Sequence, residues 1–234
     1  MNNLPDLAIM EELGEQPSFA EMMKAVSKLK NRKAAGLDQI TPELIKFSGE
    51  DMLRKLHDVI IQSWEGQQVP GGWRNPEICS IAKKGDLSLT DNWRGVSLLA
   101  VASKVLTSIV ASRLQEHVIP KWVQDSQFGF RRGRGCADGM HVIRCLQKWV
   151  DECHNESCYM TFFDLRKYYD TVPREAMWRV LGKAGVPQNL VNLIRDLHDG
   201  AQAVVRVDGK HTAPFEVKGG LRQGSTLAPA LSII

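Results

Sequence analysis

A single aspartate follows a stretch whose composition is typical of a buried β-strand. The run from Tyr159 to Phe163 leads directly into Asp164. Burying a carboxylate is unfavourable unless the carboxylate binds something, and carboxylate oxygens are suitable ligands for a divalent cation such as Mg²⁺. Asp164 is therefore a candidate metal ligand, the alternative being a turn or a helix cap. Asp170 is a weak partner for it, because a continued strand would separate the two carboxylates by about 20 Å.

A glycine-rich stretch near the end of the chain is a second candidate for chemistry. Gly219, Gly220 and Gly224 flank Arg222 and Gln223, and glycine lets the backbone approach a ligand closely. Arg222 can pair with a phosphate, and Gln223 can hydrogen-bond a base or sugar edge. The alternative is an ordinary loop between a strand and a helix.

A third stretch combines cations with aromatic rings between Gln127 and Gly135. Its arginines can contact phosphates while Phe128 or Phe130 stacks on a base, as in a nucleic-acid channel. The alternative is a solvated turn with Phe130 inserted into the core. The arginines concerned are Arg131, Arg132 and Arg134.

Cysteines and histidines also gather in one part of the chain. His141 and Cys145 are four residues apart on an expected helix, so the two could share a Zn²⁺ ion. The spacing matches no common zinc module, and free cysteine is often an ordinary core residue, so zinc is only an alternative here. The group comprises Cys136, His141, Cys145, Cys153, His154 and Cys158.

The periodicity of apolar residues predicts the elements that position these stretches. The helices are expected at 19–29, from 41 onward, 53–66, 99–117, 136–153, 174–183 and 190–198, with Ser18 capping the first and Pro120 ending the fourth. Strands are expected at 78–82 and 159–163, and a hairpin is expected to turn at Asp208-Gly209. Helices with a few strands in the second half favour an α+β fold, helix-rich with a small antiparallel sheet.

Composition narrows the class of protein. Of 234 residues 43% are hydrophobic and 24% are charged, with a net charge of +3, which is typical of a globular domain and compatible with nucleic acid. No run of 18 apolar residues occurs, so no membrane-spanning helix is expected. The first residues do not resemble a signal peptide, and the odd cysteine count favours a reducing compartment. We therefore expect an intracellular protein of the cytoplasm or nucleus.

The three stretches, in this order, resemble the reverse transcriptases of non-LTR (LINE-type) retrotransposons. The resemblance runs from residue 33 to the end of the chain and is carried by six motifs in the family's order. These are Lys33–Asp38, Lys83–Asp86, Trp93–Leu99, Gln127–Arg134, Phe162–Asp170 and Gly220–Pro229.

The resemblance implies a fold and partners. It implies the fingers and part of the palm of a right-hand polymerase, with an acidic tail at 1–17, a fingers-like helical region at 18–155 and an incomplete palm at 156–234. The partners implied are an RNA template, a DNA primer and a deoxynucleoside triphosphate (dNTP), with two Mg²⁺ ions as cofactors.

The resemblance also assigns roles to residues. Asp164 corresponds to the catalytic aspartate that binds both ions, joined on one ion by the carbonyl of Leu165. Tyr169 corresponds to the residue beneath the sugar that excludes a 2′-hydroxyl. Nucleotide- or template-binding roles are implied for Lys83, Lys84, Arg94, Arg131, Tyr169, Arg222, Gln223 and Gly224.

Departures from the family pattern limit these expectations. The sequence has no Asp-Asp pair, the family's third catalytic motif, and one aspartate with one carbonyl is a poor cage for two six-coordinate ions. We therefore expect the chain to be inactive as a polymerase by itself, and the alternative function is a remnant that at most binds RNA or DNA. Tyr168 stands where the family usually has alanine, which predicts a more crowded site.

Overall fold

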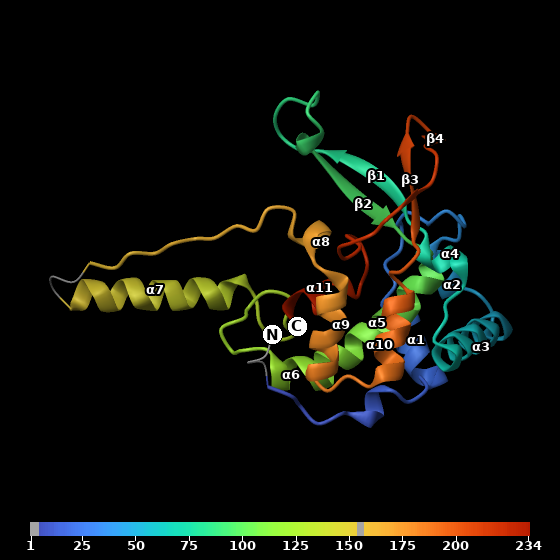
Figure 1. Ribbon diagram of the computed structural model, residues 1–234, viewed down its shortest axis with the longest axis horizontal. Helices are drawn as coiled ribbons and strands as arrows, with labels where there is room; N and C mark the ends of the chain where they lie inside the picture. Colours follow the sequence, from blue (N-terminus) through green and yellow to red (C-terminus); the bar gives the residue numbers. More distant parts are fainter. Residues whose placement is uncertain (1–4, 154–156) are drawn as a thin grey trace.

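Helices packed below a small sheet form the body of the molecule, and one long helix projects from it (Figure 1). The computed structural model describes residues 5–153 and 157–234. The helices are α1 (Phe19–Ser27), α2 (Pro42–Lys46), α3 (Glu50–Gly66), α4 (Gly71–Arg74), α5 (Val101–Arg113), α6 (Ile119–Trp122), α7 (Cys136–Glu152), α8 (Tyr168–Thr171), α9 (Arg174–Lys183), α10 (Gln188–Asp196) and α11 (Ala228–Ile233). Short 3₁₀ turns lie at Glu11–Leu13 and Thr90–Asn92.

The first helix begins where the sequence predicts. Ser18 caps α1, because its hydroxyl accepts a hydrogen bond from the backbone N–H of Glu21 at 3.2 Å. The carboxylate of Glu21 does not complete a capping box. It pairs instead with Arg113 on α5 at 2.7 Å. Glu21, in the first turn of α1, therefore links α1 to α5 through an ion pair.

The core forms around α5, which lies at the centre of the helical layer in Figure 1. Val105, Leu106, Ile109 and Val110 are fully buried there. Helix α5 contacts α1, α2 and α4, while α10 contacts α3 and α9. The helices predicted from apolar stripes at 174–183 and 190–198 are confirmed as α9 and α10, within two residues.

Pro120 does not end the long helix, contrary to expectation. After Arg113 the chain widens into a π-helical turn, Leu114–Val118, and continues into α6. Pro120 lies in the first turn of α6, where the missing N–H of proline has little cost. The wide turn therefore carries the chain past a residue that would break a regular helix.

The sheet is mixed, so the predicted antiparallel sheet is only partly correct. Its strands are β1 (Glu77–Ala82), β2 (Trp93–Leu98), β3 (Gln202–Val207), β4 (Lys210–His211) and β5 (Phe215–Glu216). The order is β2-β1-β3-β4, with β5 also paired to β3. Strands β1 and β2 pair antiparallel, but β1 and β3 pair in parallel. The β1–β2 hairpin and the β3–β4 hairpin therefore meet through the pair β1–β3. Neither hairpin determines the direction in which the other pairs with it, so the sequence pattern of each hairpin does not predict the parallel pairing.

The predicted turn between β3 and β4 is confirmed. Asp208 and Gly209 have φ angles of 49° and 77°, the left-handed pair that a tight hairpin turn requires. Arg206 pairs with His211 across the turn.

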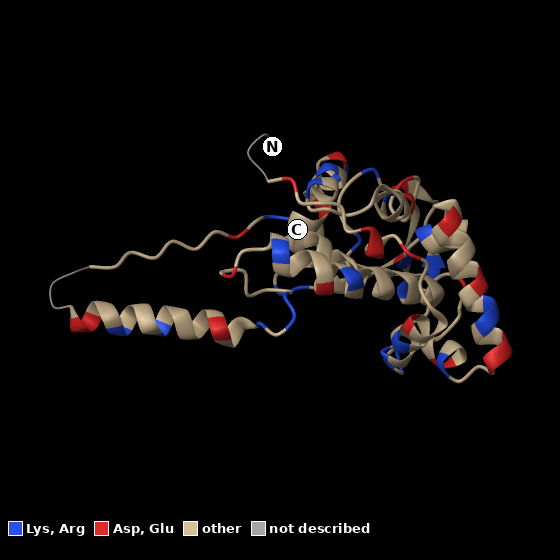
Figure 2. Ribbon diagram, turned by 90° about the horizontal axis from the view of Figure 1, so that it is seen from below, with Lys and Arg blue, Asp and Glu red and all other residues tan. Residues whose placement is uncertain are grey.

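The strand predicted at 159–163 is absent, which is the main error of the sequence analysis. The segment runs extended beside α7, away from the body, in both Figure 1 and Figure 2. Tyr159 is 91% exposed and Phe163 is 89% exposed. Among residues 5–153 and 157–234, no strand pairs with this segment. A β-type sequence becomes a strand only where a neighbour supplies the hydrogen bonds.

The projecting helix itself is confirmed as α7, and none of its residues is buried. Nowhere in the described part of the chain is a helix both long and apolar enough to cross a membrane.

Candidate functional site

The short helix α8 and the glycine-rich stretch are joined through their backbones. Leu221 donates its N–H to the carbonyl of Tyr169 at 2.6 Å, and Gly220 donates to the carbonyl of Val172 at 3.1 Å. Gly220 has φ +72°, and a Cβ there would lie 2.5 Å from the Tyr169 carbonyl oxygen. Two motifs about 50 residues apart in the sequence therefore meet in one place, and the meeting requires glycine.

The same stretch also joins strand β2. Ser97 donates its N–H to the carbonyl of Gln223 at 2.9 Å. Gly224 has φ +105°, and a Cβ there would lie 2.5 Å from the Ser97 carbonyl oxygen. Strand β2, helix α8 and the glycine-rich stretch thus converge.

A cavity of about 320 Å³ lies where these three segments meet. Its walls include four residues that the sequence analysis selected, and they come from β2, α8 and the glycine-rich stretch. The cavity is lined by Arg94, Val96, Tyr169, Gln223, Gly224, Ser225, Ala228 and Pro229. Arg94 is exposed, so its guanidinium is available to an anion. The cavity therefore combines a cation, an aromatic ring and an amide.

A second cavity, of about 250 Å³, lies on the other face of β2. Gly95 and Ser97 line this one, whereas Arg94 and Val96 line the first, as expected from the alternation of side chains along a strand. Gln223 lines both cavities. Gln223 therefore lies between the two cavities.

Asp170 orients the side chain of Gln223, a role the sequence analysis missed. The Gln223 amide Nε2 donates to Asp170 Oδ1 at 3.1 Å. Because the carboxylate can only accept, the amide NH₂ faces Asp170, and Oε1 remains as the acceptor. No sequence signal marks this pair, since its members are 53 residues apart.

Arg222 does not line the first cavity; it lines the second one and supports the loop. It is 4% exposed, and its Nη1 donates to the carbonyls of Trp73 at 3.3 Å and Arg74 at 3.0 Å. Burial, with the nearby charge of Arg174, lowers the pKa of Arg222 to about 10, so it stays charged at neutral pH. This placement does not support the phosphate contact that the sequence suggested.

Arg174, at the start of α9, holds the first part of the glycine-rich stretch, and the sequence analysis did not select it. Its buried guanidinium donates to the carbonyls of Gly219, Gly220, Val217 and His198 at 2.8–3.1 Å. A helix-start arginine has no sequence signature for such a role.

Asp164 and Leu165 do not join the cavity. Both are exposed and neither lines it. The chain is anchored just after them, where Arg166 and Lys167 each pair with Asp91 at 2.9 Å. These ion pairs lower the pKa of the Asp91 carboxyl, the hydrogen bond from Lys167 being the largest cause.

The residues present do not fit a pair of Mg²⁺ ions. Within the described ranges, no three residues among His, Cys, Asp and Glu gather where they could hold a metal ion. Mg²⁺ takes about six oxygen ligands in near-octahedral geometry, and Asp164 with the Leu165 carbonyl offers two. No metal-dependent step follows from this arrangement.

The remaining predicted cations do not line the cavity. Arg131 donates to the carbonyl of Gln124 at 2.9 Å and pairs with Asp125 at 3.1 Å. Lys83 donates to the carbonyl of Asp91 at 3.0 Å, and Lys84 is exposed. The arginine-rich loop shows as blue ribbon at the base of α7 in Figure 2. Its Phe130 is 57% exposed, so that ring is not inserted into the core.

The cysteine and histidine group does not assemble a metal site in the described residues. His141 Nε2 and Cys145 Sγ are 3.5 Å apart, but no third ligand joins them there. The cysteines of the group are exposed, and His154 lies outside the described residues.

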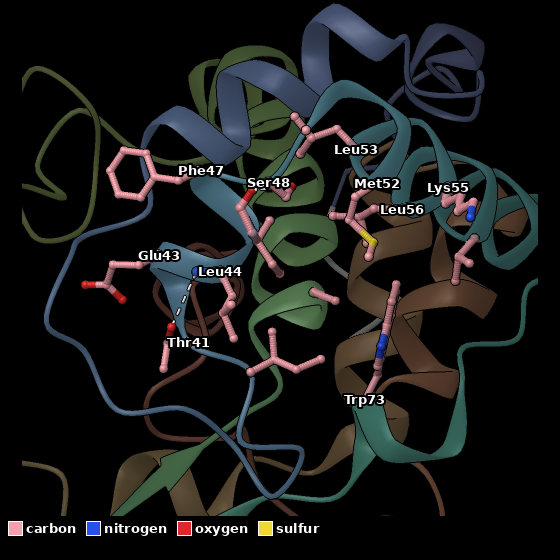
Figure 3. A pocket seen from close by; sticks show the side chains of 15 residues that line it. Thr41, Glu43, Leu44, Phe47, Ser48, Met52, Leu53, Lys55, Leu56 and Trp73 are labelled. Atoms are coloured by element: carbon pink, nitrogen blue, oxygen red, sulfur yellow. Dashed lines mark hydrogen bonds between the residues drawn. The ribbon is translucent and has the colours of Figure 1, made fainter.

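A larger cavity lies elsewhere, between α2 and α3 (Figure 3). It has a volume of about 1020 Å³ and mostly apolar walls, including Leu44, Met52 and Trp73. None of the residues that the sequence analysis selected lines it. Size alone therefore does not identify the site, and residue chemistry favours the smaller cavity.

The structure is an α+β domain of the reverse transcriptase type, with helices packed around a small mixed sheet. Arg94 on β2, Tyr169 on α8 and the Gln223-Gly224 loop surround one cavity. Residues 81–234 match the family model described as "Reverse transcriptase (RNA-dependent DNA polymerase)". The chain belongs to this family.

Curated relatives include proteins of non-LTR retrotransposable elements. The chain is 29% identical over 227 residues to "Putative 115 kDa protein in type-1 retrotransposable element R1DM" of Drosophila melanogaster, covering 95% of the chain and 21% of that protein. It is 27% identical over 218 residues to "RNA-directed DNA polymerase from mobile element jockey" of Drosophila funebris, covering 92% and 23%. It is 25% identical over 221 residues to "Transposon TX1 uncharacterized 149 kDa protein" of Xenopus laevis, covering 94% and 17%. The chain thus spans about a fifth of the length of these relatives.

Proposed function

We propose that this reverse transcriptase domain acts in RNA-directed DNA synthesis and that the 320 Å³ cavity binds the incoming dNTP. The template would be RNA and the primer DNA. One observation carries the proposal: Arg94, Tyr169 and Gln223 come from three separate motifs, yet they line the same cavity.

Each residue has a role that suits a nucleotide. The guanidinium of Arg94 would pair with the triphosphate, since arginine binds phosphate oxygens through parallel hydrogen bonds. The ring of Tyr169 would lie against the sugar and exclude a 2′-hydroxyl. Gln223, whose Oε1 is an acceptor, would bond the sugar or base, and Gly224 lets the backbone come close. Lys83, Lys84 and Arg131 would serve as outer cations facing the template.

In this proposal the chain divides as a right-hand polymerase does. The β1–β2 hairpin and the helices of residues 18–155 would be the fingers, and residues 156–234 would be part of the palm. The parallel pairing of β1 with β3 joins the two regions in one sheet, so their relative position would be held by backbone hydrogen bonds.

The proposal does not extend to a metal-dependent step. The reverse transcriptase family generally uses divalent metal ions, and Asp164 with the Leu165 carbonyl would be the family's first ligands. The donor set present does not complete the coordination, so the roles left to the residues around the cavity are binding and orientation of the nucleotide.

Binding of a dNTP to the 234-residue chain tests the proposal. We would measure it by equilibrium dialysis, with and without an RNA template annealed to a DNA primer. Saturable binding that tightens with the primed template is expected, because the template base adds contacts to the nucleotide. Absence of binding in both conditions would contradict the proposal. Template-dependent primer extension in the same samples would show whether turnover accompanies binding.

A further inference from the structure

Two adjacent tyrosines of α8 differ in what they face. Both pack against the hydrophobic core, but Tyr169 lines the nucleotide cavity and Tyr168 does not. The phenol of Tyr168 therefore does not crowd the cavity, contrary to the expectation from the sequence. The residue that departs from the family pattern therefore lies directly behind the residue that would touch the sugar.

Tyr168 is held in place at its far end. Its hydroxyl donates to the carbonyl of Ser232 on α11 at 2.8 Å. Burial raises the pKa of Tyr168, so the hydroxyl keeps its proton and remains a donor. Helix α11 is itself fixed, because Leu231 is fully buried and Trp122 Nε1 donates to the Ile234 carbonyl at 3.0 Å.

The ring of Tyr168 meets the ring of Tyr169 edge to face. The centroids are 5.7 Å apart and the planes are inclined by 73°, a geometry that aromatic pairs favour. The backbone of Tyr169 is also fixed, since its carbonyl accepts from Leu221. With the backbone fixed, the freedom left to Tyr169 is rotation of its side chain, and that rotation is restricted by the Tyr168 ring together with the core against which Tyr169 packs.

We propose that Tyr168 is a specificity-determining residue, which holds the Tyr169 ring against the sugar so that the site takes deoxyribonucleotides in preference to ribonucleotides. The inference rests on the proposed function of the cavity. The Tyr169 ring can exclude the 2′-hydroxyl of a ribonucleotide only while the ring stays in place, because a mobile ring could move aside for one additional oxygen atom. Tyr168 acts through Tyr169 and is not itself in contact with the nucleotide.

The alternative role for Tyr168 is to fill space in the core. A space-filling residue would affect stability, and its replacement would weaken dNTP and ribonucleotide binding equally. The ratio of the two dissociation constants separates these roles, because that ratio cancels a general loss of folded protein.

The test measures binding of dATP and of ATP to the intact chain carrying Tyr168→Leu, which removes the ring. Tyr168→Phe is the matched control, since it keeps the ring and loses only the bond to Ser232. The expected result is that Tyr168→Leu reduces the preference for dATP roughly fivefold, the scale of one aromatic pair, mainly by tightening ATP binding. Tyr168→Phe should keep the preference within about twofold. If Tyr168→Leu does not fold, Tyr168→Met replaces it, because methionine fills a similar space flexibly.

The failures of the two proposals look different. If the unmodified chain prefers dATP and the leucine or methionine variant keeps that preference, the role of Tyr168 is wrong and the nucleotide site stands. Equal binding of dATP and ATP by the unmodified chain would overturn the role of Tyr168 together with the exclusion of a 2′-hydroxyl by Tyr169, while nucleotide binding in the cavity would stand. If the unmodified chain binds neither nucleotide, the proposed function fails and the inference fails with it.

Discussion

Arg94 gives the cavity its charge. It lies on β2, exposed, where the alternation of the strand places it on the cavity side with Val96. The motif Trp93–Leu99 identifies Arg94 as a candidate from the sequence. The structure adds that β2 meets the glycine-rich stretch, so that Arg94 lines a cavity with Gln223 and Gly224.

Replacing Arg94 tests that assignment. We expect Arg94→Ala to weaken dNTP binding by roughly 10- to 100-fold, since a hydrogen bond to a charged group contributes about 1.5–3 kcal/mol. The fold stability should change little, because Arg94 is exposed. Arg54→Ala is the control, as Arg54 is an exposed arginine that pairs with Glu50 on α3. Equal loss of binding in both variants would mean that general charge, and not the cavity, attracts the nucleotide.

The hydrogen bond between Gln223 and Asp170 can be tested by mutation. Asp170→Asn keeps an oxygen that can accept from Gln223, whereas Asp170→Ala removes it. Asp170→Ala should weaken dNTP binding roughly 5- to 10-fold, about one hydrogen bond, and Asp170→Asn should stay near the unmodified value. In the Gln223→Ala background, Asp170→Ala should have no further effect on binding. A full additional loss there would show that Asp170 acts independently of Gln223.

At the scale of elements, the site depends on close backbone contacts between the glycine-rich stretch and its neighbours. Gly220 has a left-handed backbone conformation, and a Cβ placed there would lie 2.5 Å from the Tyr169 carbonyl oxygen. Nothing lies within 4 Å of a Cβ placed at Gly219. The two adjacent glycines therefore form a matched pair for mutation.

Gly220→Ala should destabilise the fold by about 3 kcal/mol, combining the cost of a left-handed alanine with that of overpacking. It should also abolish dNTP binding, because α8 would separate from the stretch. Gly219→Ala should stay within about 1 kcal/mol of the unmodified chain. Urea unfolding and dialysis of both variants provide the check, and similar behaviour of the two would contradict the described docking.

How far the sequence predicts the elements depends on whether their signals are local. The sequence predicts helices α1, α7, α9 and α10 because their signals, caps and apolar stripes, are local. It wrongly predicts a strand at 159–163, since strand formation depends on a neighbour that composition does not reveal. The parallel pairing of β1 with β3 was missed for the same reason.

The same distinction applies to the site. Motif resemblance selected Arg94, Tyr169, Gln223 and Gly224, which the structure brings to one cavity. It also selected Arg222, but burial is a property of the folded chain and could not be read from a glycine-rich stretch.

Considered over the whole molecule, two buried arginines and a buried histidine lie beneath the site. Arg174, Arg222 and His198 are all buried. His198 Nδ1 donates to the carbonyl of Ile194 at 2.8 Å. Burial, with the charges of Arg222 and Arg174, lowers the pKa of His198 to about 3. The folded protein therefore holds this histidine neutral.

This cluster predicts how stability depends on pH. In the unfolded chain His198 takes up a proton near pH 6.5, and in the folded chain only near pH 3. Between these values the unfolded state binds more protons, so lowering the pH favours unfolding by up to about 1.4 kcal/mol per pH unit. Urea unfolding at pH 7 and pH 5 measures the loss. His198→Gln should reduce this part of the pH dependence, and an unchanged slope would show that other groups cause it.

The proposed function depends most on the position of the nucleotide. Photo-crosslinking a dNTP analogue to the intact chain, followed by mass spectrometry of the labelled peptides, tests that position most directly. We predict labels on peptides that contain Arg94, Tyr169 or residues 219–229, and competition by unlabelled dNTP. Labels confined to the apolar groove between α2 and α3, or labels that unlabelled dNTP does not displace, would contradict the assignment of the cavity.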